Sequence, residues 1–299
     1  FDCDLALDGI RQMLWGFFKK VVVADNCALF VNGVFENYQT LDGSTLFLGA
    51  FFFTIQIYGD FSGYSDIAIG CARLFGIDLM QNFKYPYFSR DIAEFWRRWH
   101  ISLTTWFRDY IYIPLGGSRA GKWKSFRNTL VIFLVSGFWH GANWTFVAWG
   151  AYHALLFLPL LLLGQNRRYR DSVAENSFLP SVKELTQMGA TFLLVLLGWI
   201  LFRSEDISQA AVYLERMFNV SLFSAPQLVG LGFGQLLLKK CFFFTALMFV
   251  VEWIGRKQAH GLMIEDLSLP VRYVIYTVLL IIIYGFDASN PQGFIYFQF

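Results

Sequence analysis

Long apolar stretches separated by short polar segments dominate the sequence. The longest is residues 143–164, NWTFVAWGAYHALLFLPLLLLG, and its length matches the about 20 residues that a helix needs to cross a bilayer. The other apolar stretches are residues 45–58, 59–77, 128–141, 188–202, 241–255 and 271–287. This pattern predicts an all-α protein in which several helices cross a membrane, that is, a polytopic helical bundle.

Residues 8–34 mix apolar runs with charged residues and are predicted to form an interfacial or bundle-facing helix. Residues 94–110 are predicted to be an amphipathic helix at the membrane interface, and residues 204–219 an amphipathic surface helix. At about 100° per residue, the spacing in segment 94–110 predicts one continuous helix with Trp99 on its apolar face. Its charged residues, including Arg98, fall on the opposite face, which is expected to meet water or lipid headgroups.

Composition supports a membrane protein rather than a soluble one. Of the 299 residues, 56% are hydrophobic and only 15% are charged, whereas an average soluble domain has about 25% charged residues. No internal repeat or linker is evident, so residues 1–299 are expected to form a single membrane domain.

The charges are unevenly distributed along the chain. Residues 84–127 contain nine Lys or Arg and three Asp or Glu, a net charge of +6 in a chain whose total is +2. Basic connecting segments favour the cytoplasmic side of a membrane. A basic patch can also bind nucleic acid, but this one is interleaved with tryptophan and flanked by membrane segments. Anionic lipid headgroups are therefore the expected partner, and no nucleic acid is expected.

The four histidines differ in their sequence context. His260 lies in the polar segment RKQAHG and is expected to be solvated, and His153 lies within a helix, where a structural hydrogen bond is expected. His140 ends an apolar run between Gly137 and Gly141. Ionisable groups inside a membrane usually face an interior cavity, and burial favours the neutral imidazole that a general base requires.

The residues alone leave three roles open for His140: a catalytic base, a structural histidine, or a group lining a transport path. No G-x-S-x-G, Cys–His, HExxH or dinucleotide-binding pattern offers a competing centre. The four cysteines lack metal-ligand spacing, so no metal site is expected.

Three longer stretches resemble the membrane-bound O-acyltransferase (MBOAT) family, in its polysaccharide O-acetylation branch. They are YGDFSGYSDIAIG (58–70), NFKYPYFSRDIAEFWRRWHISLTTWFRDYIYIPLGGSR (82–119) and RNTLVIFLVSGFWHGANWTFVAWGAYHALL (127–156). The ending FIYFQF (294–299) also resembles that branch. Members are usually longer at the N-terminus, so several upstream helices are expected to be missing from this chain.

This resemblance implies a membrane helical bundle with a central cavity, in which an acyl group moves from a thioester donor to a hydroxyl. The family's invariant histidine matches His140, and its second motif residue matches His100. The resemblance implies that both are catalytic, with His140 as the base and His100 as the residue that positions it. Candidates for orienting His140 or binding substrate are Asn143, Asp60, Asp66, Arg97 and Arg98.

The resemblance also implies the reaction partners. The donor is expected to be acetyl-CoA, used as a substrate with no bound cofactor, and the acceptor to be an exopolysaccharide such as alginate. Periplasmic acetyltransferases of the SGNH or AlgJ type are the expected protein partners, and the bacterial inner membrane is the expected location. Two alternatives stay open: D-alanyl transfer to teichoic acids, and a non-enzymatic acyl conduit or transporter.

Overall fold

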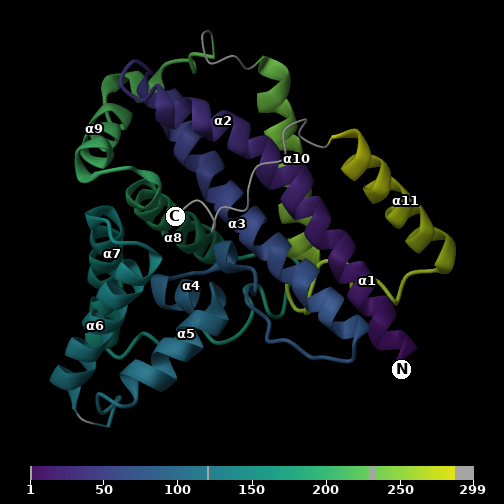
Figure 1. Ribbon diagram of the computed structural model, residues 1–299, viewed down its shortest axis with the longest axis horizontal. Coiled ribbons are helices and arrows are strands. Elements are labelled where there is room, and N and C mark those ends of the chain that lie inside the picture. Colours follow the sequence, from purple (N-terminus) through teal and green to yellow (C-terminus); the bar gives the residue numbers. More distant parts are fainter. Residues whose placement is uncertain (1, 120, 229–233, 287–299) are drawn as a thin grey trace. The chain divides into compact units, whose positions relative to one another are not determined.

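The computed structural model describes every residue except 1, 120, 229–233 and 287–299, and its described part is helical (Figure 1). Two compact units are present: unit 1 comprises residues 1–81 and 215–299, and unit 2 comprises residues 82–214. Each is described separately below. The expectation of a single membrane domain stays a prediction. The ending at 294–299 lies outside the described residues.

Unit 1 is built around a closely packed pair of helices, α1 (Cys3–Phe17) and α3 (Gly43–Leu74). A Cβ placed on Gly70 would lie 2.3 Å from the carbonyl oxygen of Gly9, and one on Gly16 would lie 2.6 Å from that of Gly63. Small residues at such crossings allow two helix backbones to touch, which is the usual packing of helices in lipid.

The other helices of unit 1 complete its packing. Helix α1 continues through a π-helix (Phe18–Ala24) into α2 (Asp25–Glu36), and α10 (Gln235–Ile254) and α11 (Leu269–Gly285) also contact this π-helical segment. Helix α3 contains the stretch 45–58 and continues through most of the stretch 59–77, and the Asp42 side chain caps it by accepting from the Thr45 amide at 2.9 Å.

Unit 2 contains two short helices, α4 (Ile92–Arg98) and α5 (Ile101–Phe107), and three long ones, α6 (Lys122–His140), α7 (Trp144–Leu162) and α8 (Val182–Arg203). A three-residue turn joins α6 to α7, so the two helices form a hairpin. Helix α9 (Ile207–Met217) follows α8, inside the predicted amphipathic segment 204–219.

The prediction of one continuous helix over residues 94–110 is wrong. Trp99 is extended and His100 has a left-handed backbone conformation (φ 46°, ψ 55°), so α4 and α5 are separate helices. Backbone groups of an upstream segment stabilise this break: the Lys84 amide donates to the Arg98 carbonyl at 3.0 Å, and the Ile101 amide donates to the Asn82 carbonyl at 2.9 Å. Helical periodicity carries no information about such non-local bonds.

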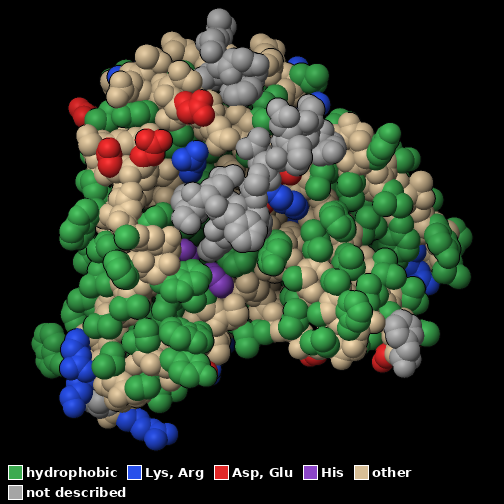
Figure 2. Space-filling view, in the orientation of Figure 1, with side chains coloured by type: hydrophobic (Ala, Val, Ile, Leu, Met, Phe, Trp, Pro, Cys, Tyr) green, Lys and Arg blue, Asp and Glu red, His purple; other side chains and the backbone are tan. Residues whose placement is uncertain are grey.

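Two described helices, α7 and α8, are long and apolar enough to cross a membrane. Only 39% of the apolar window of each is buried within the protein, which leaves apolar side chains on their outer surfaces. Helix α11 is shorter, but most of its large apolar side chains are exposed, and only Leu279 is buried. Figure 2 shows hydrophobic side chains over much of the drawn face.

Candidate active site

His140 is the last residue of α6, and an aromatic cluster in unit 2 surrounds its imidazole. Its ring centroid lies 5.0 Å from that of Trp139, 5.3 Å from Trp149 of α7 and 5.1 Å from Phe202 of α8. Trp149 and Phe202 are themselves buried. The imidazole is half-buried, so it is enclosed by apolar rings on several sides without being sealed inside the protein.

Two glycines bring α6 and α7 close enough to hold this arrangement. A Cβ on Gly137 would lie 2.2 Å from the Phe146 carbonyl oxygen, and a Cβ on Gly150 would lie 2.3 Å from that of Phe133. Because both contacts involve backbone atoms, no side-chain rearrangement could accommodate a larger residue. The His140 position therefore depends on the close crossing of the α6–α7 hairpin.

His100 occupies the break between α4 and α5. A left-handed conformation in a residue other than glycine costs about 1–2 kcal/mol, and such strained residues concentrate at functional sites. His100 Nδ1 lies 3.2 Å from Asn82 Oδ1, and the Ser102 hydroxyl donates to the same oxygen at 2.9 Å. Because an amide oxygen accepts, this contact places the imidazole proton on Nδ1 and the lone pair on Nε2.

The structure brings His100 and His140 together. Trp139 contacts both, with ring centroids 6.2 Å from His100 and 5.0 Å from His140, and the two imidazoles are close enough to interact electrostatically. Burial lowers the pKa of His100 to about 4, so its imidazole is neutral. Histidine side chains, drawn in purple, are visible among hydrophobic ones in Figure 2.

Asn143 and Arg97 both hydrogen-bond to backbone groups. Asn143 caps α7, with its Oδ1 accepting from the Thr145 amide at 3.1 Å and its Nδ2 donating to the Glu205 carbonyl at 2.6 Å. Arg97 donates to the backbone carbonyls of Asn166 and Tyr169. A role in substrate binding stays a prediction for both.

Arg98 corrects the expected distribution of charge in segment 94–110. Arg98 and Glu94 are both buried, and the guanidinium donates to Glu94 at 2.7 Å and to the Asp171 carbonyl at 3.0 Å. Arg90 donates to the same carboxylate at 3.0 Å. Trp99 is buried as predicted, but Glu94 and Arg98 are interior as well. The expectation that Arg98 lies on an outer charged face is therefore wrong.

Asp60 and Asp66 belong to unit 1, where both lie on α3. Asp60 pairs with Lys20 at 2.6 Å, and Asp66 pairs with Lys19 at 2.6 Å. Lys20 also pairs with Asp25 at 2.8 Å. A role for either acid in orienting His140 or binding substrate stays a prediction.

Two expectations for the other histidines are wrong. His260 is buried rather than solvated, and its Nε2 lies 2.9 Å from an Asp8 oxygen. His153 is fully buried, but neither ring nitrogen has a hydrogen-bond partner among the described residues. Its ring packs among the rings of Trp96 and Trp149, at centroid distances of 5.0 and 5.1 Å, instead of making the expected structural hydrogen bond.

The sequence pattern does not reveal the residues that position the histidine pair. Asn82 lies 18 residues before His100, and Phe202 lies 62 residues after His140. No local spacing links such residues, because their contacts arise only from tertiary packing. Among the described residues, no group of three or more His, Cys, Asp or Glu side chains is placed to hold a metal ion.

The comparisons with known proteins assign the chain to a family. Residues 30–172 match the MBOAT, membrane-bound O-acyltransferase, family, and that range includes both His100 and His140. The chain is 40% identical over 240 residues to the probable alginate O-acetylase AlgI of Pseudomonas aeruginosa, covering 79% of this chain and 44% of that protein. This chain belongs to the membrane-bound O-acyltransferase family.

Other relatives have different acceptors in their names. The peptidoglycan O-acetyltransferase of Helicobacter pylori is 38% identical over 206 residues, covering 69% of this chain and 38% of that protein. The teichoic acid D-alanyltransferase of Bacillus subtilis is 29% identical over 214 residues, covering 68% and 52%. The chain thus spans about half, or less, of the length of the curated relatives it matches.

Proposed function

We propose that this protein is a multi-pass O-acyltransferase of the bacterial inner membrane. It transfers an acetyl group from a thioester donor, acetyl-CoA, toward hydroxyls of an exopolysaccharide such as alginate. The observation that carries the proposal is the His100–His140 pair, which shares Trp139 and lies inside the family-matched residues 30–172.

His140 is the general base of the proposed reaction. Its neutral imidazole accepts the proton of the acceptor hydroxyl as the hydroxyl oxygen attacks the thioester carbonyl. The carbon–sulfur bond then breaks, an ester forms, and the proton returns from the imidazolium to the leaving thiolate. The surrounding aromatic rings limit the access of water, which would otherwise compete with the acceptor for the acetyl group.

His100 is the positioning residue of the pair. Its contact with Asn82 fixes the orientation of the His100 ring. The His100 ring packs against Trp139, which also packs against His140, so a fixed His100 restrains the position of the His140 imidazole. His100→Gly tests this role cleanly, because glycine adopts the left-handed conformation without strain. We expect this variant to fold normally and to lose transfer activity, although less completely than a His140 variant.

The choice of acceptor rests on the relatives. The relatives named for O-acetylation of alginate or peptidoglycan are 38–42% identical over 69–79% of this chain, whereas the teichoic acid D-alanyltransferases are 29% identical over 68% or 38% identical over 49% of it. We infer an acetyl donor and a glycan acceptor, with a periplasmic acetyltransferase of the SGNH or AlgJ type completing delivery. Asn143, Arg97 and Arg98 are candidates for orienting the substrate, and Asp60 and Asp66 are further candidates from unit 1.

The experiment is a gene deletion complemented with the full-length protein. Base-labile acetate is measured separately on exopolysaccharide and on peptidoglycan, and ester-linked D-alanine is measured on teichoic acid where the host makes it. The proposal predicts that exopolysaccharide acetate disappears on deletion and returns on complementation. Loss of D-alanine alone, or of peptidoglycan acetate alone, would assign a different acceptor.

A further inference from the structure

Asn82 contacts the break between α4 and α5 through both its backbone and its side chain. Its carbonyl accepts from the Ile101 amide at 2.9 Å. Its Oδ1 lies 3.2 Å from His100 Nδ1, and it accepts from the Ser102 hydroxyl at 2.9 Å and from the Ser102 amide at 3.3 Å. Three polar groups therefore converge on a single amide oxygen beside the left-handed His100.

The Ser102 amide fixes which way the Asn82 side chain faces. An asparagine side chain presents an oxygen that accepts and a nitrogen that donates. A backbone N–H only donates, so the Asn82 atom that it meets has to be the oxygen. His100 Nδ1 meets this same oxygen, and two lone pairs would repel each other. The imidazole proton therefore lies on Nδ1, and Nε2 carries the lone pair.

The Ser102 hydroxyl supports this tautomer of His100. It lies 2.9 Å from Asn82 Oδ1 but 3.4 Å from His100 Nδ1, so its better hydrogen bond is to the amide oxygen. A hydroxyl that donated to Nδ1 would require the imidazole proton on Nε2. Asn82 Oδ1 would then face a lone pair, and the shorter bond from Ser102 would be lost.

We propose that Asn82 is a positioning residue of the acyl-transfer site, where it holds His100 in the neutral tautomer with Nε2 as a hydrogen-bond acceptor. The inference rests on the proposed function, in which His140 is the base. When His140 accepts the proton of the hydroxyl, its imidazole becomes positively charged. A neutral His100 does not repel that charge, whereas a protonated one would, because the two imidazoles are close enough to interact electrostatically.

The neutral amide of Asn82 suits this role better than a carboxylate would. Either group accepts a hydrogen bond from Nδ1, but a carboxylate also favours the charged imidazolium. Burial lowers the pKa of His100 to about 4, and an amide leaves that effect of burial in place. Asn82 thus orients the ring without adding a charge to it.

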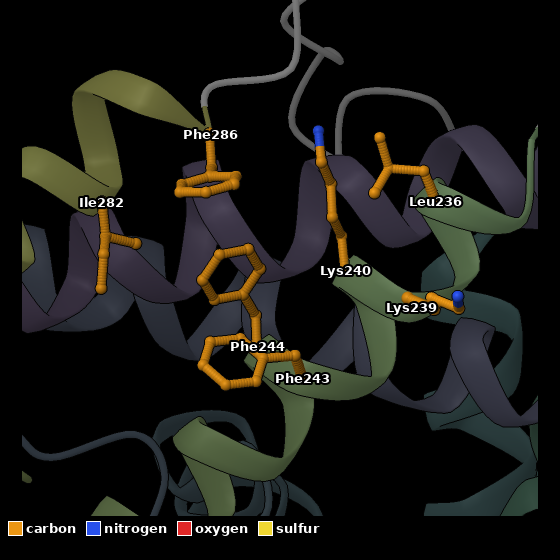
Figure 3. A pocket seen from close by; sticks show the side chains of 7 residues that line it. All are labelled: Leu236, Lys239, Lys240, Phe243, Phe244, Ile282 and Phe286. Carbon is orange, nitrogen blue, oxygen red and sulfur yellow. The ribbon is translucent and has the colours of Figure 1, made fainter.

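The pocket drawn in Figure 3 lacks such a proton acceptor. It lies in unit 1 and has a volume of about 260 Å³. Its lining side chains are Leu236, Lys239, Lys240, Phe243, Phe244, Ile282 and Phe286. The wall is almost wholly apolar, and the two ammonium groups point away from each other. A lysine ammonium donates but does not accept, so these seven side chains offer no counterpart to a neutral imidazole.

Asn82→Asp separates the proposed role from a packing role. A carboxylate has nearly the same shape and still accepts from His100 Nδ1 and from both Ser102 groups, so the break between α4 and α5 should be retained. Its charge raises the pKa of His100, because an opposite charge nearby favours the imidazolium. His100 is charged below that raised pKa, so transfer should persist at high pH and be lost as the pH falls. A purely structural Asn82 would not change the pH dependence.

The matched control is Asn176→Asp, the same substitution at an exposed position in unit 2. Other charged or titratable groups on the elements around His100 are Lys84, Asp91, Glu94, Arg97, Arg98, His140, His153 and Arg203. Arg98 pairs with Glu94 at 2.7 Å. All of these groups are the same in the wild type and in both variants, so a difference between the variants reports on the contact of Asn82 with His100.

The experiment measures the tautomer and the rate in the full-length protein. Solid-state NMR of protein containing isotope-labelled histidine distinguishes a protonated ring nitrogen from a bare one. The His100 signals are those that are absent from His100→Gly. Transfer from labelled acetyl-CoA is then measured over an acid-to-alkaline pH series for the wild type, Asn82→Asp and Asn176→Asp.

The proposal expects a protonated Nδ1 and a bare Nε2 on His100 in the wild type, and a doubly protonated ring in Asn82→Asp in mildly acidic buffer. The acid limb of the transfer rate should move to higher pH by about 1–3 pH units in Asn82→Asp, and not in Asn176→Asp.

A protonated Nε2 with a bare Nδ1 in the wild type would overturn the proposal, and this measurement needs no Asn82 variant to fold. A folded Asn82→Asp with the pH profile of the wild type would overturn it as well. Absence of acetyl transfer by the wild type would instead refute the proposed function. The two failures are distinguishable because the tautomer is measured without turnover.

Discussion

Buried lysines and carboxylates pair with one another in unit 1, whereas aromatic rings surround the histidines of unit 2. In unit 1, Lys19 lies 2.6 Å from Asp66 and 3.8 Å from Glu252, and all three side chains are buried or nearly so. In unit 2, the imidazoles of His140 and His153 both contact the Trp149 ring, at centroid distances of 5.3 and 5.1 Å. Lys19 of unit 1 and the two histidines of unit 2 are therefore surrounded by groups of different chemistry.

Buried polar groups therefore have two different roles in this protein, one in folding and one in catalysis. Opposite charges in unit 1 compensate one another, so they serve folding: removal of one leaves its partner unpaired in an apolar interior. An imidazole among aromatic rings stays neutral because an apolar environment disfavours its charged form, so it is able to accept a proton. Buried charge in this protein is therefore expected to control stability, and buried imidazole near His100 to control chemistry.

The largest loss of stability is expected from Arg98→Glu. The substitution removes a cation from the buried Glu94 and adds a second carboxylate beside it. Breaking a buried pair costs about 3–5 kcal/mol, and the added repulsion increases that cost. The measurement is the folded yield of the full-length protein in detergent by size-exclusion chromatography. A yield equal to that of an exposed control, Lys183→Glu, would contradict the buried position of Arg98.

Lys19→Met should destabilise unit 1 by about 3–5 kcal/mol, because Asp66 and Glu252 lose a shared cation. The double variant Lys19→Met/Asp66→Leu should recover much of this loss, since apolar replacement of a buried pair is often neutral. Thermal unfolding followed by tryptophan fluorescence measures both. If the double variant is no better than the single one, the lysine and Asp66 do not act as a pair.

Substitutions at His153 test whether aromatic packing or a hydrogen bond holds its imidazole. His153→Ala should cost about 2–5 kcal/mol, as expected when a buried side chain is truncated. His153→Met keeps a similar volume and should cost less than about 1.5 kcal/mol, because no hydrogen bond to the described residues is lost. Equal destabilisation by the two substitutions would indicate that the imidazole has a polar partner after all.

The smallest effects are expected at two glycines. Gly137→Ala should lower the free energy of unfolding by about 1–3 kcal/mol, because its Cβ would meet the Phe146 carbonyl oxygen at 2.2 Å.

Gly189 lies inside α8, and a Cβ added there would have no neighbouring side chain or helix within 4 Å. Gly189→Ala should therefore raise the free energy of unfolding by about 0.5–1 kcal/mol. Melting temperatures that shift in the same direction would contradict the close α6–α7 crossing.

Much of the fold follows from the hydrophobic pattern. The apolar run 143–164 coincides closely with α7, and the run 188–202 lies within α8. The apolar run 128–141 ends within one residue of the end of α6 at His140. These features are local, so periodicity and turn residues are sufficient to predict them.

The parts that the pattern did not predict depend on distant contacts. The break at His100 is stabilised by residues 82–84, and the burial of Arg98 depends on Glu94 and the Asp171 carbonyl. His260 is buried because Asp8, 252 residues away, pairs with it. For the site, the pairing of His140 with His100 came from the family resemblance, whereas the aromatic surroundings of both required the structure.

The most direct test of the central claim is the acetyl-transfer rate of His140→Ala in the full-length protein. Labelled acetyl-CoA is supplied to membranes containing equal amounts of folded wild type, His140→Ala and His153→Met, and ester-linked label on the acceptor is measured. We predict that His140→Ala slows transfer by about 10²–10⁴-fold, while His153→Met retains most of the activity. A wild-type rate from well-folded His140→Ala would contradict the assignment of His140 as the base.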